Sequence, residues 1–190
     1  MPILDIGVGD GSTSRAFIEA GCKKVVGIDL NPDMLESARE NYGDKIELVR
    51  MDARKMGFAA GEFPIIITGT AIHNIPKDER ADFWKEILRL SPEVFVSADK
   101  IADPDPEKHT AQYESETSAI RKAYGERHGL HEAEKTWLEH YEYDERERLE
   151  LGEIEENLGG EYDIEVVFEM GMNKIIVAKK KNAISANPVA

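Results

Sequence analysis

The first eleven residues constrain the fold of this chain more than any other stretch. Residues 3–6 (ILDI) are a short apolar run with β-branched side chains, as expected of a buried parallel strand. Glycines follow at alternate positions, at Gly7, Gly9 and Gly11. A backbone without side chains turns sharply and lets a ligand approach, and a helix start presents free N–H groups to it. The pattern predicts a strand–turn–helix unit that cradles a nucleotide, with Ser12 as the helix N-cap.

The spacing of these glycines discriminates between nucleotide-binding motifs. The dinucleotide pattern G-x-G-x-x-G requires its last glycine at the position of Ser12. The chain instead reads D-x-G-x-G-x-G from Asp5 to Gly11. This spacing counts against a nicotinamide-dependent oxidoreductase, which we keep as an alternative.

Strand and helix patterns alternate as far as residue 98. A helix is expected to open at Asn31-Pro32-Asp33, with asparagine as N-cap and proline in the first turn, and to end at Gly43. A second helix is expected over 77–90. Apolar runs predict further strands at 24–30, 46–50, 63–68 and 93–98. This alternation is typical of an α/β fold with a doubly wound, mostly parallel sheet.

The alternation of strand and helix patterns ends after residue 100. Charged helices are predicted over 107–127, 131–142 and 144–158, and two closing strands over 164–168 and 174–179 pair antiparallel. We expect one domain over 1–181, with a helical insertion at about 101–143, and a flexible tail over 182–190.

Charge and composition exclude several functions. The chain has 24 basic and 38 acidic side chains among 190 residues, a net charge of −14, with 18 acidic against 7 basic between residues 101 and 161. Such a surface disfavours nucleic acid as a partner. The sequence shows no membrane span or signal peptide, so we expect a cytoplasmic protein. Cys22 is the single cysteine, and we expect neither a disulfide nor a metal site.

Several stretches, taken in order, resemble the motifs of class I S-adenosylmethionine (SAM) methyltransferases, and in particular a UbiE-like branch that acts on small molecules. The segment from Asp5 to Gly11 resembles their first motif, and Asp29 and Asp52 stand where acids follow their second and third strands. Residues 68–76 are similar to the fourth motif, in the variant that ends ALHHLP in many small-molecule methyltransferases and reads AIHNIP here at 71–76. Later similarities lie at 97–100, at Trp137-x-x-His140 and at 173–178.

The resemblance implies a fold and a cofactor site. The fold is a seven-stranded, Rossmann-like sheet with its last strand antiparallel and a helical insertion after strand five that forms part of the substrate pocket. Relatives carry an earlier segment that lids the cofactor, which this chain is expected to lack. For the cofactor SAM, the glycine loop wraps the methionyl part, Asp29 binds the ribose hydroxyls, Met34 packs on adenine, Asp52 accepts from the adenine amino group and Asp5 supports the loop and the amine. The implied cofactor-binding set is Asp5, Gly7, Val8, Gly9, Gly11, Asp29, Leu30, Met34, Asp52, Ala53, Thr68 and Gly69.

The catalytic group is left open. Methyl transfer needs mainly alignment of nucleophile, carbon and sulfur, and a base only when the acceptor arrives protonated. His73, beyond the fourth strand, is a candidate base, a substrate contact or a structural histidine, with the structural role slightly preferred. In the insertion, Trp137 and His140 are expected to anchor the helices on the sheet. Candidate pocket residues there are His109, Tyr113, Arg121 and His128.

The resemblance predicts a SAM-dependent methyltransferase acting on a small-molecule acceptor through an O, N or C nucleophile. The alternative from another functional class is a protein that binds SAM but does not catalyse a reaction. A tRNA methyltransferase is disfavoured by the net charge of −14. A homodimer is left open.

Overall fold

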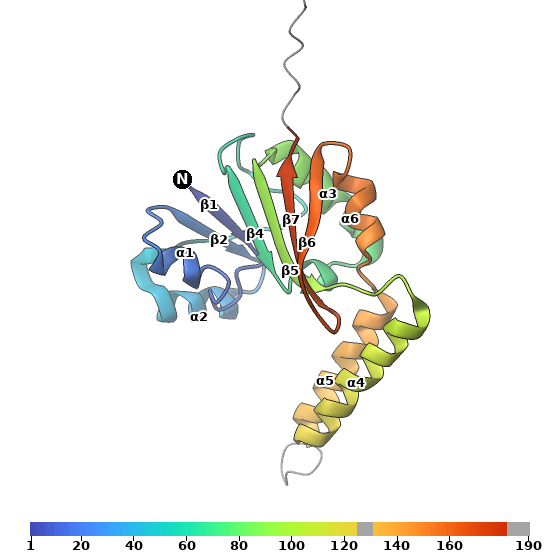
Figure 1. The fold of residues 1–190 in the computed structure, drawn as a ribbon. Helices are drawn as coiled ribbons and strands as arrows, with labels where there is room; N and C mark the ends of the chain where they lie inside the picture. Colours follow the sequence, from blue (N-terminus) through green and yellow to red (C-terminus); the bar gives the residue numbers. More distant parts are fainter. Residues whose placement is uncertain (125–130, 182–190) are drawn as a thin grey trace, which may run out of the picture.

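The computed structural model describes residues 1–124 and 131–181, and the expectations for His128 and for the tail lie outside these ranges. A sheet of seven strands forms the centre of the molecule, in the order β3-β2-β1-β4-β5-β7-β6 (Figure 1). The strands are β1 Ile3–Ile6, β2 Val25–Asp29, β3 Glu47–Arg50, β4 Ile65–Gly69, β5 Val94–Lys100, β6 Tyr162–Met170 and β7 Asn173–Lys180.

The pairing of the strands confirms the predicted fold class. β1 pairs in parallel with β2 on one side and with β4 on the other, so that Ile6 lies beside both Ile28 and Thr68. β7 runs antiparallel to β5 and to β6. The strand order reverses between β1 and β4, and open α/β sheets bind ligands at the carboxyl ends of the strands beside such a reversal.

The helices begin and end where local chemistry favours it. The Asn31 side chain accepts a hydrogen bond from the N–H of Asp33 at 2.9 Å, and Gly43 ends α2 with φ at 55°, both as predicted. Short 3₁₀ turns lie at Gly43–Lys45, Ile72–Asn74 and Lys77–Glu79. The helices are α1 Arg15–Glu19, α2 Pro32–Tyr42, α3 Arg80–Leu90, α4 Pro106–Tyr124, α5 His131–Arg146 and α6 Leu151–Leu158.

Alternating side chains of β2 are buried on both faces of the sheet. Val26 and Ile28 belong to the main core with the apolar side of α3, including Phe83. Val25 points the other way and packs in a smaller core with Leu35 of α2. Burial on both faces explains why this strand reads as an almost continuous apolar run.

Two local predictions are wrong. Ser14, not Ser12, precedes α1, and the Ser12 hydroxyl instead donates to the Asp10 carboxylate at 2.6 Å within the glycine loop. The single helix expected over 144–158 is interrupted between α5 and α6. Carbonyl oxygens in this interruption accept from the buried guanidinium of Arg80, a long-range contact that continuous helix would not allow.

The insertion is a pair of helices that extends away from one end of the sheet (Figure 1). Tyr113 of α4 and Tyr141 of α5 pack edge to face, with ring centroids 6.2 Å apart. His140 packs on His73 of the sheet domain at 5.7 Å between ring centroids, as an anchor would. Trp137 is 44% exposed and contacts His140, so its expected anchoring on the sheet is wrong. Within the described ranges, no helix has both the length and the apolar character of a membrane span.

Candidate functional site

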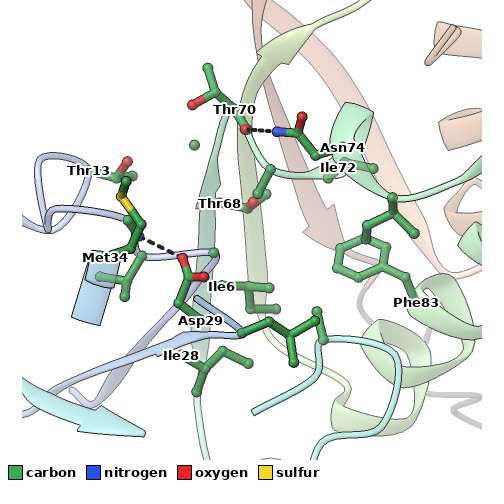
Figure 2. A pocket seen from close by; sticks show the side chains of 18 of the residues that line it. Ile6, Thr13, Ile28, Asp29, Met34, Thr68, Thr70, Ile72, Asn74 and Phe83 are labelled. Carbon is green, nitrogen blue, oxygen red and sulfur yellow. Dashed lines mark hydrogen bonds between the residues drawn. The ribbon is translucent and has the colours of Figure 1, made fainter. Parts of the chain in front are cut away.

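A cavity of about 510 Å³ opens at the carboxyl ends of β1, β2 and β4. Its walls come from the glycine loop, from the end of β2 with the start of α2, from the turn after β3, and from the end of β4 with the turn that follows. Figure 2 shows Asp29 and Met34 on one side of the cavity and Ile72 and Phe83 on the other. The cavity lies where the strand order reverses, which is the place expected for a ligand in such a sheet.

The structure brings most of the predicted cofactor-binding residues together around this cavity. Asp5 and Gly11 are the exceptions, because neither lines it. The predicted residues that line it are Gly7, Val8, Gly9, Asp29, Leu30, Met34, Asp52, Ala53, Thr68 and Gly69.

Asp29 connects the end of β2 to the glycine loop. One of its carboxylate oxygens accepts from the backbone N–H of Gly9 at 3.0 Å (Figure 2). The other accepts from the N–H of Asn31 at 2.9 Å. The side chain is half-buried at the cavity wall. Since each carboxylate oxygen accepts more than one hydrogen bond, Asp29 retains capacity for donors on a ligand.

The glycines of the loop serve different purposes. Gly7 has φ at 67°, and a Cβ there would lie 2.5 Å from the Cβ of Ala71, so glycine lets the loop approach the turn after β4. Gly9 has φ at 53° with open space around a Cβ position. A Cβ at Gly11 would meet the ring of Tyr42 at 2.5 Å, so Gly11 allows the loop to pack on α2 rather than to line the cavity.

Asp5 lies behind the loop and is fully buried. One carboxylate oxygen accepts from the Ser14 hydroxyl at 2.6 Å, and the other has no hydrogen-bond partner among the described residues. Burial raises the pKa of Asp5 to about 7, although the Ser14 hydrogen bond acts in the opposite direction. The position fits the predicted support of the loop, and the contact with Ser14 also holds the start of α1.

Asp52 is paired with Arg54, a cation for which the sequence gives no functional signal. The Arg54 guanidinium donates to both carboxylate oxygens of Asp52, at 2.6 Å from Nη2 and 2.9 Å from Nε, and also pairs with Glu79. The Arg54 hydrogen bonds lower the pKa of Asp52 below its usual value, so the carboxylate is ionised at neutral pH. Arg54 itself lines the cavity beside Asp52.

Several polar side chains lie at the end of β4 and in the turn that follows, and the sequence predicts only some of them at the site. The Thr68 hydroxyl is buried and lacks a hydrogen-bond partner among the described residues. Asn74 donates through its side-chain amide to the Thr70 carbonyl at 2.9 Å, which closes the turn after β4 (Figure 2). Thr70 and Asn74 line the cavity and belong to the stretch that resembles the fourth motif, while Thr13 lines it without any sequence signal.

His73 does not line this cavity. It is 3% exposed, and its Nδ1 is hydrogen-bonded to the Asp99 carboxylate at the end of β5. The other Asp99 oxygen accepts from the N–H of Ile72 at 2.8 Å, which fixes the turn that carries the histidine. A catalytic role for His73 stays a prediction, and this geometry favours the structural role.

His109 and Tyr113, two candidate pocket residues of the insertion, do not line the main cavity. His109 and Tyr113 border a second cavity of about 20 Å³, together with His73, Lys100 and Tyr141. In the parts of the chain that the structure describes, α4 and α5 contribute nothing to the wall of the main cavity. The expected contribution of the insertion to a substrate pocket stays a prediction.

Comparison with known proteins agrees with this geometry. Residues 3–92 match the family described as Methyltransferase domain. Demethylmenaquinone methyltransferase of Chlorobaculum parvum is 34% identical over 88 residues, covering 46% of this chain and 35% of that protein. A putative protein N5-glutamine methyltransferase of Methanocaldococcus jannaschii is 31% identical over 83 residues, covering 43% and 42%. The matches span less than half the length of these curated relatives.

Solved structures show the same fold over nearly the whole chain. Magnesium protoporphyrin IX methyltransferase of Synechocystis, with bound S-adenosylhomocysteine, aligns with 95% of this chain and 74% of its own, at 16% identity and a TM-score of 0.61. The strand order and the cavity define a class I, Rossmann-like methyltransferase fold. Residues 3–92 are similar to methyltransferase domains, and the described chain as a whole shares its fold with SAM-dependent methyltransferases.

Proposed function

We propose that this chain binds SAM in the main cavity and transfers its methyl group to a small-molecule acceptor. The observation that carries the proposal is the Asp29 carboxylate, which joins the Gly7–Gly9 loop to the end of β2 at the wall of that cavity. An acceptor group and a bare backbone loop meet there at the reversal of strand order, as in nucleotide-binding sheets.

The lining residues fit the chemical parts of SAM. A volume of about 510 Å³ lies within the range of small-molecule sites. The free acceptor capacity of Asp29 suits the two ribose hydroxyls, which are donors. Met34 is 42% exposed and Leu30 51% exposed at the cavity, and both offer apolar contact to adenine. The ionised Asp52 is an acceptor for the adenine amino group.

The remaining residues of the proposed site act on the other end of the cofactor. The Gly7-Val8-Gly9 loop leaves room for the methionyl part, and Thr68 and Gly69 line the cavity beside it at the end of β4. Ala53 lies next to Asp52 in the wall. Asp5 and Gly11 support the loop from behind, through Ser14 and Tyr42.

The chain contributes alignment to the reaction. Bound SAM supplies a methyl group activated by its sulfonium. Alignment of a nucleophile with that carbon is worth about 7–11 kcal/mol in well-oriented reactions. Ile72 and Phe83 exclude water from one side of the cavity, and the Thr70 and Asn74 side chains lie in the wall where an acceptor would be oriented.

The acceptor class is inferred from shape and charge. The site is a concave cavity rather than an open surface, and the net charge of −14 opposes nucleic-acid acceptors. The second candidate function is SAM binding without turnover, and one observation favours it: the candidate base His73 points away from the cavity towards Asp99.

A methyl-transfer assay distinguishes these functions. The full chain is incubated with SAM labelled in its methyl group and, separately, with a metabolite extract, a protein extract and bulk tRNA. Asp29→Ala serves as the inactive control, and S-adenosylhomocysteine is measured as the common product. We expect label in the metabolites. Label in protein or tRNA contradicts the small-molecule proposal, and cofactor binding without product in any arm supports the alternative function.

A further inference from the structure

Three potential metal ligands from distant parts of the chain meet outside the main cavity. His73 lies in the 3₁₀ turn after β4, while His140 and Asp144 lie one turn apart on α5. One ligand atom from each residue can be chosen so that all three lie within 4.8 Å of one another. Since the spacing in the sequence is wide, no motif revealed this cluster.

The distances within the cluster are close to those of a metal site. His73 Nε2 lies 3.9 Å from one oxygen of Asp144, and His140 Nε2 lies 3.7 Å from the other. Zinc–ligand bonds of about 2.0–2.2 Å in tetrahedral geometry separate neighbouring ligand atoms by a little more than 3 Å. Small side-chain movements therefore bring the three groups onto one ion.

Two ligand atoms are buried without any hydrogen-bond partner among the described residues. They are His73 Nε2 and Asp144 Oδ1, on side chains that are 3% and 10% exposed. Leaving a buried polar atom without a partner is destabilising, so such atoms call for an explanation. Both point into the same cluster, and a cation between them would satisfy both.

The Asp99 carboxylate orients the ring of His73 for metal binding. The Asp99 carboxylate binds Nδ1 of His73, which leaves Nε2 as the free ligand atom and orients the ring. Such carboxylate–histidine pairs are the usual support of metal-binding histidines.

Lys100 is the cation already present beside the cluster. Its Nζ lies 2.6 Å from Asp144 Oδ2 and packs over the ring of Tyr141. It occupies one carboxylate oxygen and leaves Oδ1 free. A cavity of about 20 Å³, bordered by His73 and Asp144, is large enough for one water molecule as a fourth ligand.

We propose that His73, His140 and Asp144 bind a divalent transition-metal ion, with Zn²⁺ as the best match to two imidazoles and one carboxylate. The ion ties α5 of the helical insertion to the turn after β4. Ile72 and Asn74, on either side of His73, line the main cavity, so the ion also holds that part of the cavity wall. The proposal does not depend on the methyl-transfer proposal.

The test is a titration of the chelator-treated full chain with Zn²⁺ alone, followed by isothermal calorimetry, and with Co²⁺, followed by its visible absorption. The test variant is His140→Gln, since His140 is partly exposed and its replacement is the least disruptive of the three. The matched control is His131→Gln, on the same helix with a side chain that is 72% exposed. Asp144→Asn tests the carboxylate independently, and circular dichroism establishes that each variant is folded.

We expect one Zn²⁺ per chain in the wild type, and at least about a 10-fold loss of affinity in His140→Gln and in Asp144→Asn. His131→Gln should bind as the wild type does. The Co²⁺ complex should show the visible bands of nitrogen and oxygen coordination only in the wild type and the control. A folded wild type that binds no Zn²⁺ overturns the proposal, as does Zn²⁺ binding that survives in folded His140→Gln and Asp144→Asn.

Discussion

The carboxylate of Asp29, at the end of β2, accepts a hydrogen bond from the backbone N–H of Gly9 at 3.0 Å. This contact links two strand ends that are neighbours in the sheet, since Gly9 follows β1. It holds the glycine loop beside an ionisable group at the cavity wall. The central proposal of a SAM site therefore depends on one side chain with two functions, orienting the loop and binding the ligand.

Replacing Asp29 should separate binding from folding. Asp29→Ala removes the proposed charge-assisted hydrogen bonds to the ribose, and we expect SAM affinity to fall by more than about 1 kcal/mol. The matched control is Asp33→Ala, because Asp33 is exposed on the first turn of α2 and does not line the cavity. Calorimetric titration measures both variants. Unchanged affinity in folded Asp29→Ala would refute its ribose role.

Two substitutions in the glycine loop separate the cost of a steric clash from the cost of a left-handed backbone conformation. Gly7→Ala combines a positive φ with a Cβ clash against Ala71, whereas Gly9→Ala has the positive φ alone. The left-handed conformation costs an alanine about 1–2 kcal/mol. We expect Gly7→Ala to lower the free energy of unfolding by about 1 kcal/mol more than Gly9→Ala, measured by denaturant unfolding of the ligand-free chain. Equal losses would mean that Ala71 moves aside freely.

Asp5 should make stability depend on pH. Its pKa is about 7 in the folded chain against 3.8 in the unfolded chain, so the folded state holds the proton more tightly between these values. Its contribution is full below pH 3.8 and decreases as pH rises to about 7. Relative to Asp5→Asn, the wild type should lose roughly 2 kcal/mol of unfolding free energy between pH 5 and pH 8. A constant difference across this range, measured by urea unfolding, would show that Asp5 titrates normally.

Arg80 should be among the most important buried polar residues. It is 1% exposed, donates to the carbonyls of Ile75 and Arg148 at 2.9 Å, and pairs with Glu153 at 3.1 Å. Arg80→Met removes the donor from both carbonyls and the paired cation from Glu153, and we expect the free energy of unfolding to fall by about 3 kcal/mol or more. The control, Lys85→Met, breaks only an exposed pair with Asp82 and should change stability by less than about 1 kcal/mol. Similar effects of the two variants in chemical denaturation would contradict this account.

Features encoded within short stretches could be predicted from the sequence. The predicted strand over residues 3–6 is confirmed, and the limits of α2 follow from Asn31, Pro32 and Gly43. These features depend on apolar periodicity and on capping by neighbouring residues, which act over a few positions. The same reasoning placed acids at the ends of β2 and β3, and therefore at the cavity.

Features that depend on contacts between residues far apart in the sequence could not be predicted. The interruption between α5 and α6 depends on Arg80, and the orientation of His73 depends on Asp99. Arg54 reaches Asp52 over only two positions, yet its place in the cavity wall depends on the turn after β3. The metal-ligand cluster joins a turn after β4 to a helix some seventy residues later, so no spacing rule applies to it.

The most direct test of the SAM site is calorimetric titration of the purified chain with SAM, S-adenosylhomocysteine and NADH. We predict that both adenosyl ligands bind once per chain, that Asp29→Ala weakens them, and that NADH does not bind. Binding of NADH, or a folded chain that binds none of the three ligands, would contradict the account.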